Sequence, residues 1–243
     1  MRGAIIHMPK LIFDIETVGE DWDSLDSLTQ ESLTRWIKKE SANEEEYQVS
    51  LKDLKEELGF SALTGEIVAI GVMDVEKNQG KVYFSAPESQ VAPWRNDLFQ
   101  FEPMSEKEML ERFWEGAKNY QEFITFNGRA FDVPYMLARG AKYDIRASCD
   151  LMANRYLSSQ KFGVKHIDLL DQLSFYGAVR RKGSLHMWTR LFNIKSPKGE
   201  GVGGDDVAGL FKARHYQKIA EYNSLDLVAT RELYLRWEKL LRF

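Results

Sequence analysis

Two carboxylates interrupt the first strongly apolar segment of the chain, and they constrain its fold more than any other feature. Residues 10–16 read Lys-Leu-Ile-Phe-Asp-Ile-Glu, so Asp14 and Glu16 alternate with apolar side chains. Residues two apart in a strand project from the same face, and a carboxylate in apolar surroundings is costly unless it is paired or bound to a cation. The segment therefore predicts a largely buried strand. Its two acids form either a cation site or an ordinary strand end where both reach solvent, and Asp-x-Glu alone does not decide between them.

Length and composition limit the class of protein. The chain has 243 residues, enough for one sizeable α/β domain or two small ones, and no linker rich in Pro, Gly or Ser divides it. No apolar run reaches the roughly 18 residues of a membrane span, and the N-terminal apolar part is too short for a signal peptide. The single cysteine, Cys149, excludes an intramolecular disulfide framework. We therefore expect a cytoplasmic protein with no membrane partner and a small, partly buried Cys149.

Charge is distributed unevenly along the chain. The net charge of −4 disfavours a protein that coats nucleic acid, but it allows an enzyme that grips only a chain end. Acidic residues outnumber basic ones by about two to one between residues 20 and 59. The balance reverses between residues 161 and 198, which form either a solvated face or a surface for a phosphate backbone. The basic residues there are Lys161, Lys165, Arg180, Arg181, Lys182, Arg190, Lys195 and Lys198.

Hydrophobic periodicity and turn signals predict a mixed sheet with helices packed on it. Residues 77–80 predict a hairpin turn between two strands. Ser105 and Glu108 predict a capping box at a helix start, and Pro134 is tolerated in the first turn of a helix that begins near Phe131. The expected strands are residues 10–16, 66–73, 81–85, 122–126 and 166–170, and the expected helical stretches are 22–58, 105–114, 131 onward, 184–192, 206–214 and 215–241.

Two further acids stand at structurally defined positions. Asp132 follows a strand and the turn Asn127-Gly128 at the opening of a helix, where capping and the helix dipole favour an acid in any case. Tyr222 and Asp226 are four apart in the last helix and share one helical face. An exposed aspartate beside a half-buried tyrosine would explain that pair without a function. His166 and Asp168 could form a metal pair, but a structural hydrogen bond is the favoured interpretation.

The ordered combination of these motifs carries more information than any one of them. Asp-x-Glu on an early strand, Asn-Gly-x-x-Phe-Asp after a later strand, and Tyr-x-x-x-Asp on the last helix resemble the DEDDy family of 3′-5′ exonucleases. That family includes the proofreading domain of family B DNA polymerases. The chain is most similar to the stand-alone, predicted polymerase-B-like exonucleases, and residues 64–71 and 198–207 also resemble that group.

The resemblance runs from about residue 11 to residue 237 and has consequences for the fold. It implies a ribonuclease H-like α/β domain, with a mixed sheet flanked by helices, that occupies residues 1–243 as a single unit. An acidic helical insertion at residues 20–64 departs from the family pattern. A negative surface near the cleft would repel a phosphate backbone, so this insertion bears on how a substrate enters.

The resemblance also assigns roles to individual residues. It implies that Tyr222 orients the attacking water, because Glu221 stands where the DEDDh subgroup has its histidine. We expect Asp14 to bridge two ions, and Asp132 to hold one of them through waters. Thr17, Asn127 and Phe131 are the implied substrate contacts. The implied metal-associated acids are Asp14, Glu16, Asp132 and Asp226.

Hard oxygen ligands select Mg²⁺ or Mn²⁺ over zinc, and two such ions can together activate water and stabilise the leaving oxygen in phosphodiester hydrolysis. The expected function is therefore 3′-5′ exonuclease activity on single-stranded nucleic acid, with DNA as the first candidate. One alternative is an exoribonuclease acting on RNA 3′ ends. Another is a ribonuclease H-like module that binds nucleic acid, or a replication or repair partner, without cutting.

Overall fold

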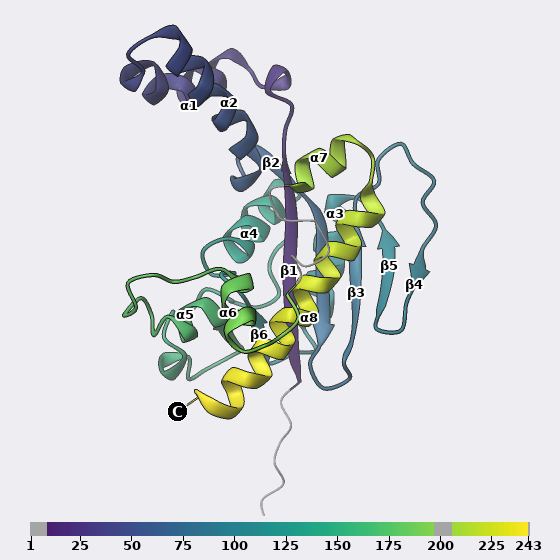
Figure 1. Ribbon diagram of the computed structural model, residues 1–243. Helices are drawn as coiled ribbons and strands as arrows, with labels where there is room; N and C mark the ends of the chain where they lie inside the picture. Colours follow the sequence, from purple (N-terminus) through teal and green to yellow (C-terminus); the bar gives the residue numbers. More distant parts are fainter. Residues whose placement is uncertain (1–8, 197–205, 243) are drawn as a thin grey trace, which may run out of the picture.

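A seven-stranded mixed sheet forms the centre of the molecule (Figure 1). The computed structural model describes residues 9–196 and 206–242. The strand order is β4-β5-β3-β2-β1-β6-β7, with β1 antiparallel to β2 and parallel to β6. The strands are β1 (Lys10–Gly19), β2 (Gly65–Asp74), β3 (Gln79–Phe84), β4 (Trp94–Arg95), β5 (Phe99–Pro103), β6 (Glu122–Thr125) and β7 (Lys165–Asp168).

Helices cover both faces of this sheet, and the long α8 crosses one of them (Figure 1). The α-helices are α1 (Ser27–Glu40), α2 (Glu44–Glu57), α3 (Glu106–Ala117), α4 (Asp132–Lys142), α5 (Leu169–Leu173), α6 (Leu185–Leu191), α7 (Val207–Lys212) and α8 (Tyr216–Leu240). Single 3-10 turns occur at η1 (Trp22–Ser24), η2 (Leu58–Phe60) and η3 (Leu157–Ser159). Among the described residues, no helix is both long enough and apolar enough to cross a membrane. The α/β fold expected from the sequence is confirmed.

The alternation of side chains along β1 decides where the acids lie. Ile12 and Val18 belong to the hydrophobic core under α8, whereas Phe13 and Ile15 belong to the core under α3 and α4. Since successive side chains of a strand point to opposite faces, Asp14 and Glu16 lie together on the α8 side, between Ile12 and Val18. The acids therefore interrupt an apolar face in mid-strand and do not mark a strand end.

The predicted elements are largely confirmed, with two differences. No strand was expected between residues 86 and 104, where β4 and β5 lie, because β4 has only two residues and a polar turn follows it. The last predicted strand was also too long: β7 ends at Asp168, whose side chain accepts a hydrogen bond from the Leu170 amide and caps α5. The capping box at Ser105 and Glu108 is present as expected.

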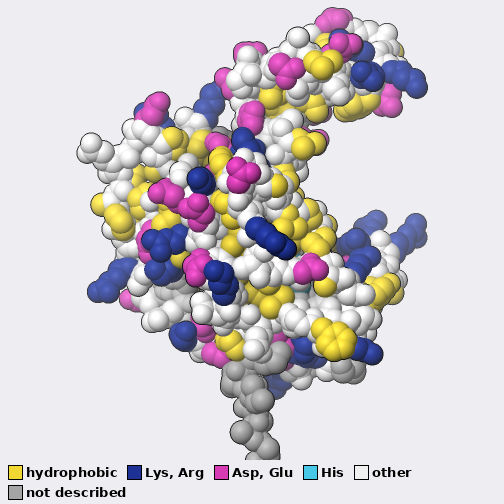
Figure 2. Space-filling view, turned by 180° about the vertical axis from the view of Figure 1, so that it is seen from behind, with side chains coloured by type: hydrophobic (Ala, Val, Ile, Leu, Met, Phe, Trp, Pro, Cys, Tyr) yellow, Lys and Arg dark blue, Asp and Glu magenta, His cyan; other side chains and the backbone are white. Residues whose placement is uncertain are grey.

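The acidic insertion folds as a helical arm, α1 and α2, between β1 and β2 (Figure 1). Asp26 and Asn43 cap the two helices. At its base, the Thr17 hydroxyl donates to the Gly59 carbonyl oxygen at 2.8 Å. A Cβ on Gly59 would lie 2.9 Å from the Gly19 nitrogen, so the two chain segments at the base touch through their backbones. From the opposite side, the arm overhangs a hollow in the molecular surface (Figure 2).

A buried ion pair fixes α4 to α3. Arg139, which is 4 % exposed, donates from Nε to Glu106 Oε1 at 2.7 Å and from Nη2 to Oε2 at 2.6 Å. Glu106 also accepts hydrogen bonds from the Ile67 backbone amide in β2 and from the Tyr143 hydroxyl. One carboxylate thus joins a strand and two helices, and it fixes the helix that begins with Asp132.

Removal of this cation should be costly. Arg139→Met leaves the Glu106 carboxylate buried without its partner, and we expect the free energy of unfolding to fall by about 3–5 kcal/mol. Lys118→Met is the matched control, because its ion pair with Glu115 is exposed and should contribute less than about 1 kcal/mol. Urea denaturation of both variants measures the difference, and equal losses would contradict the role given to the buried pair.

Candidate metal centre

Three carboxylates from opposite ends of the chain converge above the centre of the sheet. Asp14 and Glu16 come from β1 and Asp226 from α8, and a ligand oxygen from each lies within 4.8 Å of the other two. Glu16 is 7 % exposed and Asp226 is 9 % exposed. Carboxylate oxygens at this spacing are hard ligands suited to Mg²⁺ or Mn²⁺. The sequence-predicted acids Asp14, Glu16 and Asp226 are therefore together.

Asp132 reaches the same region through the β1 backbone. Strand β6 pairs with β1 only as far as Ile12, so beyond that point β6 offers no acceptor to the edge of β1. Asp132, the first residue of α4, takes this place: its Oδ1 accepts from the Ile15 amide at 3.0 Å. Asp132 lies outside the three-residue cluster, yet its charge is the largest carboxylate contribution to the raised pKa of Asp14.

The turn before α4 is held by Asp168 at the end of β7. The Asp168 carboxylate accepts from the backbone amides of Asn127 and Arg129, both at 2.9 Å. Asn127 adopts a φ of 68°, a left-handed conformation that asparagine tolerates. A Cβ on Gly128 would lie 2.4 Å from Thr125 Oγ1, so only glycine fits beside it. Asp168 therefore acts on the site by shaping the turn that delivers Asp132.

Asn223 is a site residue that the sequence interpretation did not identify. It is fully buried on α8, and its Nδ2 donates to Asp14 Oδ2 at 2.9 Å and to Glu16 Oε1 at 3.4 Å. The available signal was a polar amide between Tyr222 and Leu225, on the helix face that carries Asp226. A buried asparagine next to predicted metal ligands is a candidate partner for them, because buried polar groups are rarely left without hydrogen bonds.

Burial and neighbouring carboxylates raise the pKa values of Asp14, Glu16 and Asp132. Burial is the largest cause for Asp14 and Glu16, and the charges of neighbouring carboxylates raise the pKa of both further. Burial raises the pKa of Asp132 to about 7. The Asn223 hydrogen bond lowers the pKa of Glu16 and so opposes these effects. A site of this kind strongly favours a bound cation, since a positive charge would relieve both desolvation and repulsion.

Tyr222 lies one helical turn before Asp226, and it is 6 % exposed. Burial, followed by the charges of Asp226 and Glu16, raises the pKa of its hydroxyl well above the ordinary value. A hydrogen bond to the Asp226 side chain raises the pKa further. The phenol therefore stays protonated at neutral pH, and it can orient a water molecule but cannot serve as a general base.

The three predicted substrate contacts have different surroundings. Thr17 lines a cleft of 540 Å³ together with exposed Phe60, although its hydroxyl is already bonded to Gly59. Phe131 is partly buried at the N-cap of α4, and its ring centroid lies 5.5 Å from that of Tyr135. Asn127 contributes its backbone to the turn described above. Contact of these residues with a nucleotide stays a prediction.

Two other sequence interpretations are confirmed. The imidazole of His166 contacts Thr125 Oγ1 and the Leu151 carbonyl oxygen, both at 2.9 Å, so its role is structural. Burial lowers the pKa of His166 to about 4, which keeps the ring neutral. Cys149 is a free, partly buried thiol. Of the segment 198–207, which resembles the exonuclease group, residues 198–205 lie outside the described residues.

The sheet, the crossing helix and the carboxylate cluster define an α/β domain suited to binding divalent cations. A family model described as a predicted 3′-5′ exonuclease related to the exonuclease domain of PolB matches residues 65–242. The chain belongs to this family. The matched range includes Asp132, Tyr222 and Asp226, whereas Asp14 and Glu16 precede it and are brought to the site by β1.

Two curated relatives of the chain are DNA polymerases. The chain is 28 % identical over 188 residues to a DNA polymerase of Thermococcus litoralis, across 70 % of this chain and 10 % of the polymerase. It is 27 % identical over 187 residues to that of Thermococcus aggregans, across 70 % of this chain and 9 % of the polymerase. The chain thus spans about a tenth of these relatives.

The fold is shared with a solved polymerase structure. The family B DNA polymerase of Pyrobaculum calidifontis superposes with a TM-score of 0.56 at 14 % identity. The superposition covers 96 % of this chain and 24 % of that one. At this identity the likeness shows the fold alone, which is that of the ribonuclease H-like exonuclease domain.

The raised acid pKa values predict how stability depends on pH. A folded acid with a raised pKa binds protons more tightly than the unfolded chain, so stability falls as pH rises through that pKa. For Asp132 a rise from 3.8 to about 7 costs about 4 kcal/mol at about 1.4 kcal/mol per unit. We expect the melting temperature without metal to fall as pH rises from 3.8 to about 7, the unfolded and folded pKa values of Asp132, and Mn²⁺ to restore it.

Asp132→Asn should make this fall shallower, because the amide oxygen can still accept from Ile15 without carrying a charge. Asp53→Asn, a change of an exposed carboxylate on α2, is the control and should leave the slope unaltered. A melting temperature that rises with pH, or an unchanged slope in Asp132→Asn, would contradict the assignment. Differential scanning fluorimetry in EDTA provides the measurement.

Proposed function

We propose that this chain is a DEDDy-type 3′-5′ exonuclease that hydrolyses the terminal phosphodiester bond of single-stranded nucleic acid, with DNA as the first candidate substrate. The observation that carries the proposal is the convergence of Asp14, Glu16 and Asp226 within 4.8 Å. Tyr222 one turn away, and Asp132 beside them, complete the predicted set. Family membership supports the reaction class, and the polymerase relatives favour DNA.

The carboxylates would hold two Mg²⁺ or Mn²⁺ ions. Such ions, when bound, supply a hydroxide nucleophile and neutralise charge on the phosphate and the leaving oxygen. Asp14 is affected by the charges of Asp132, Glu16 and Asp226 together, and it would be the ligand shared by both ions. Glu16 and Asp226 would complete one position. Asp132, held by the Ile15 amide, would contribute to the second through water.

Tyr222 would orient the attacking water. Its hydroxyl donates a hydrogen bond to Asp226, which leaves an oxygen lone pair to accept a hydrogen bond from that water. Because the Tyr222 pKa is raised, the hydroxyl stays protonated at neutral pH. The proton that the water loses would therefore pass to a carboxylate of the site or to solvent.

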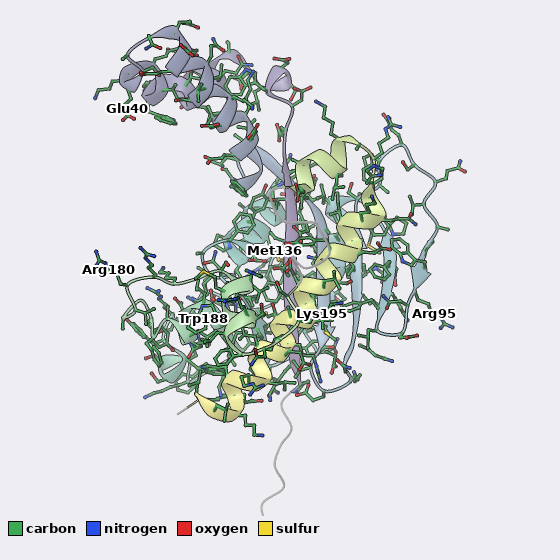
Figure 3. All side chains as sticks on the ribbon, viewed as in Figure 1. Glu40, Arg95, Met136, Arg180, Trp188 and Lys195 are labelled. Atoms are coloured by element: carbon green, nitrogen blue, oxygen red, sulfur yellow. The ribbon has the colours of Figure 1, made fainter. Side chains whose placement is uncertain are left out.

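A basic loop offers a surface for the rest of the strand. Arg180, Arg181 and Lys182 are exposed in the segment before α6. Arg180 lies across the hollow from the arm, whose Glu40 is negatively charged (Figure 3). Lys and Arg side chains cluster below the arm on the same side (Figure 2). We infer that the phosphates of a bound strand contact this loop. Residues 20–64 form an accessory arm of a single domain, and their negative charge would repel the phosphate backbone of the strand from the arm.

The activity is tested with a 5′-labelled single-stranded DNA and an RNA of the same sequence, in Mn²⁺, Mg²⁺ or EDTA. We expect a ladder that shortens from the 3′ end of DNA, lost in EDTA and in Asp14→Ala. Tyr222→Phe keeps the ring but cannot orient water, so kcat should fall roughly 100-fold. Retention of the ladder in Asp14→Ala would point to a contaminating nuclease.

The same assay separates the alternatives. Preferential shortening of RNA would make the chain an exoribonuclease. Binding of either strand with no cleavage in Mn²⁺ or Mg²⁺ would favour the non-cutting module, which the acidic arm also allows. The control variant is Ser224→Ala, whose hydroxyl donates to the Glu221 carbonyl oxygen within α8.

The basic loop gives a separate prediction about binding. In an Asp14→Ala background, which prevents cleavage, replacement of Arg180, Arg181 and Lys182 by Ala should weaken single-strand binding. The slope of log affinity against log salt should fall by about 0.7 per lost phosphate contact. The control replaces Lys107 and Lys118 on α3, which are similarly exposed. Fluorescence anisotropy at several salt concentrations measures both, and identical slopes would reject the loop.

A further inference from the structure

The Asn223 side chain occupies a socket that only a glycine can provide. Gly71 in β2 is paired with Asp14 across the β1–β2 ladder. A Cβ at this position would lie 1.9 Å from Asn223 Oδ1 and 2.6 Å from Leu227 Cδ1. Gly71 has no positive φ, so the fold uses its lack of a side chain and not its conformational freedom. The missing Cβ is what lets the amide lie beside Asp14.

The amide is committed to two of the predicted ligands. Its two N–H groups can serve two acceptors, and Nδ2 lies 2.9 Å from Asp14 Oδ2 and 3.4 Å from Glu16 Oε1. The other end of the side chain, Oδ1, is buried and has no hydrogen-bond partner. An unpartnered buried oxygen carries a free-energy cost. This cost occurs in a side chain whose Nδ2 donates hydrogen bonds to both Asp14 and Glu16.

Neither an apolar residue nor an acidic residue could replace Asn223 in this socket. An apolar side chain would leave both carboxylates without this donor, and an acid would add another negative charge to the cluster. Alone among small polar side chains, an amide offers two N–H donors with no net charge. The contact also lies on α8, the helix that carries Asp226. It therefore fixes the β1 ligands relative to the α8 ligand.

We propose that Asn223, seated over Gly71, is a positioning residue that holds Asp14 and Glu16 in ligand geometry before a divalent ion binds. The proposal rests on the proposed metal-dependent function of the site. It is distinct from the implied roles of the five family residues, because Asn223 acts through Asp14 and Glu16 and does not touch substrate. Partners that orient metal ligands in this way contribute strongly to metal affinity.

Manganese affinity of the folded protein is the first test. Asn223→Ala removes the donor, and Gly71→Ala displaces the amide without altering it. We expect each to weaken Mn²⁺ binding roughly 10- to 100-fold, as measured by calorimetry on samples whose far-UV spectra match the wild type. Activity lost in either variant should return as Mn²⁺ is raised, since the ligands themselves are intact. A purely structural role would lower stability and leave the Mn²⁺ affinity unchanged.

The double variant supplies a sharper criterion. Once Asn223 is alanine, the methyl group at position 71 no longer meets an amide, and the close neighbour that remains is the end of the flexible Leu227 side chain. The affinity loss in Gly71→Ala/Asn223→Ala should therefore equal that of Asn223→Ala alone, and additive losses would overturn the shared-contact explanation. Ser224→Ala, on the same helix, is the control and should bind Mn²⁺ as the wild type does.

Crystal structures without metal separate this inference from the proposed function. The inference requires the oxygens of Asp14 and Glu16 to keep their positions relative to Asp226 in the wild type and to move apart in Asn223→Ala. Unmoved carboxylates, or wild-type Mn²⁺ affinity in Asn223→Ala, would overturn it. A wild-type protein that neither binds Mn²⁺ nor cuts would overturn the proposed function, while the metal-free comparison would still decide whether Asn223 positions the acids.

Discussion

Mutual repulsion among buried carboxylates is the constraint around which this structure is organised. Burial and the charges of neighbouring carboxylates, Asp226 among them, raise the pKa values of Asp14, Glu16 and Asp132. The chain opposes that repulsion with neutral donors: the Ile15 amide, the Asn223 amide and the Tyr222 hydroxyl. These donors reduce the cost of the cluster but add no positive charge. The negative charge of the cluster therefore remains uncompensated, and bound divalent cations would neutralise it.

Much of the fold and most of the site could be predicted from the sequence, for identifiable reasons. Asp14 and Glu16 stood out because acids are rare on an apolar strand face, and Tyr222 and Asp226 were linked by helical spacing. Asn223 was not predicted as a site residue because its contact with the acids depends on Gly71, which lies 152 positions away in the chain (223 − 71). Strands β4 and β5 were not predicted because they are short, with two and five residues, and short strands carry little periodicity. Long-range pairings of this kind leave no local pattern.

Family membership and geometry contribute different parts of the identification. The family match begins at Gly65 and includes the acids of α4 and α8. The structure adds β1, where Asp14 and Glu16 lie beside those acids although the helical arm separates them in sequence. The arm therefore does not disrupt the strand pairing on which the site depends: β1 and β2 remain antiparallel neighbours on either side of it.

The narrow base of the arm has an evolutionary consequence. The two segments that enter and leave it meet through Gly19 and Gly59, and the Thr17 hydroxyl joins them to the end of β1. The groups that set the electrostatics of the acids come instead from β1, α4 and α8. Length, charge and surface of the arm can therefore diverge between related chains while the chemistry beneath it is preserved. The sheet serves as a platform for the acids, and the arm as an attachment to that platform.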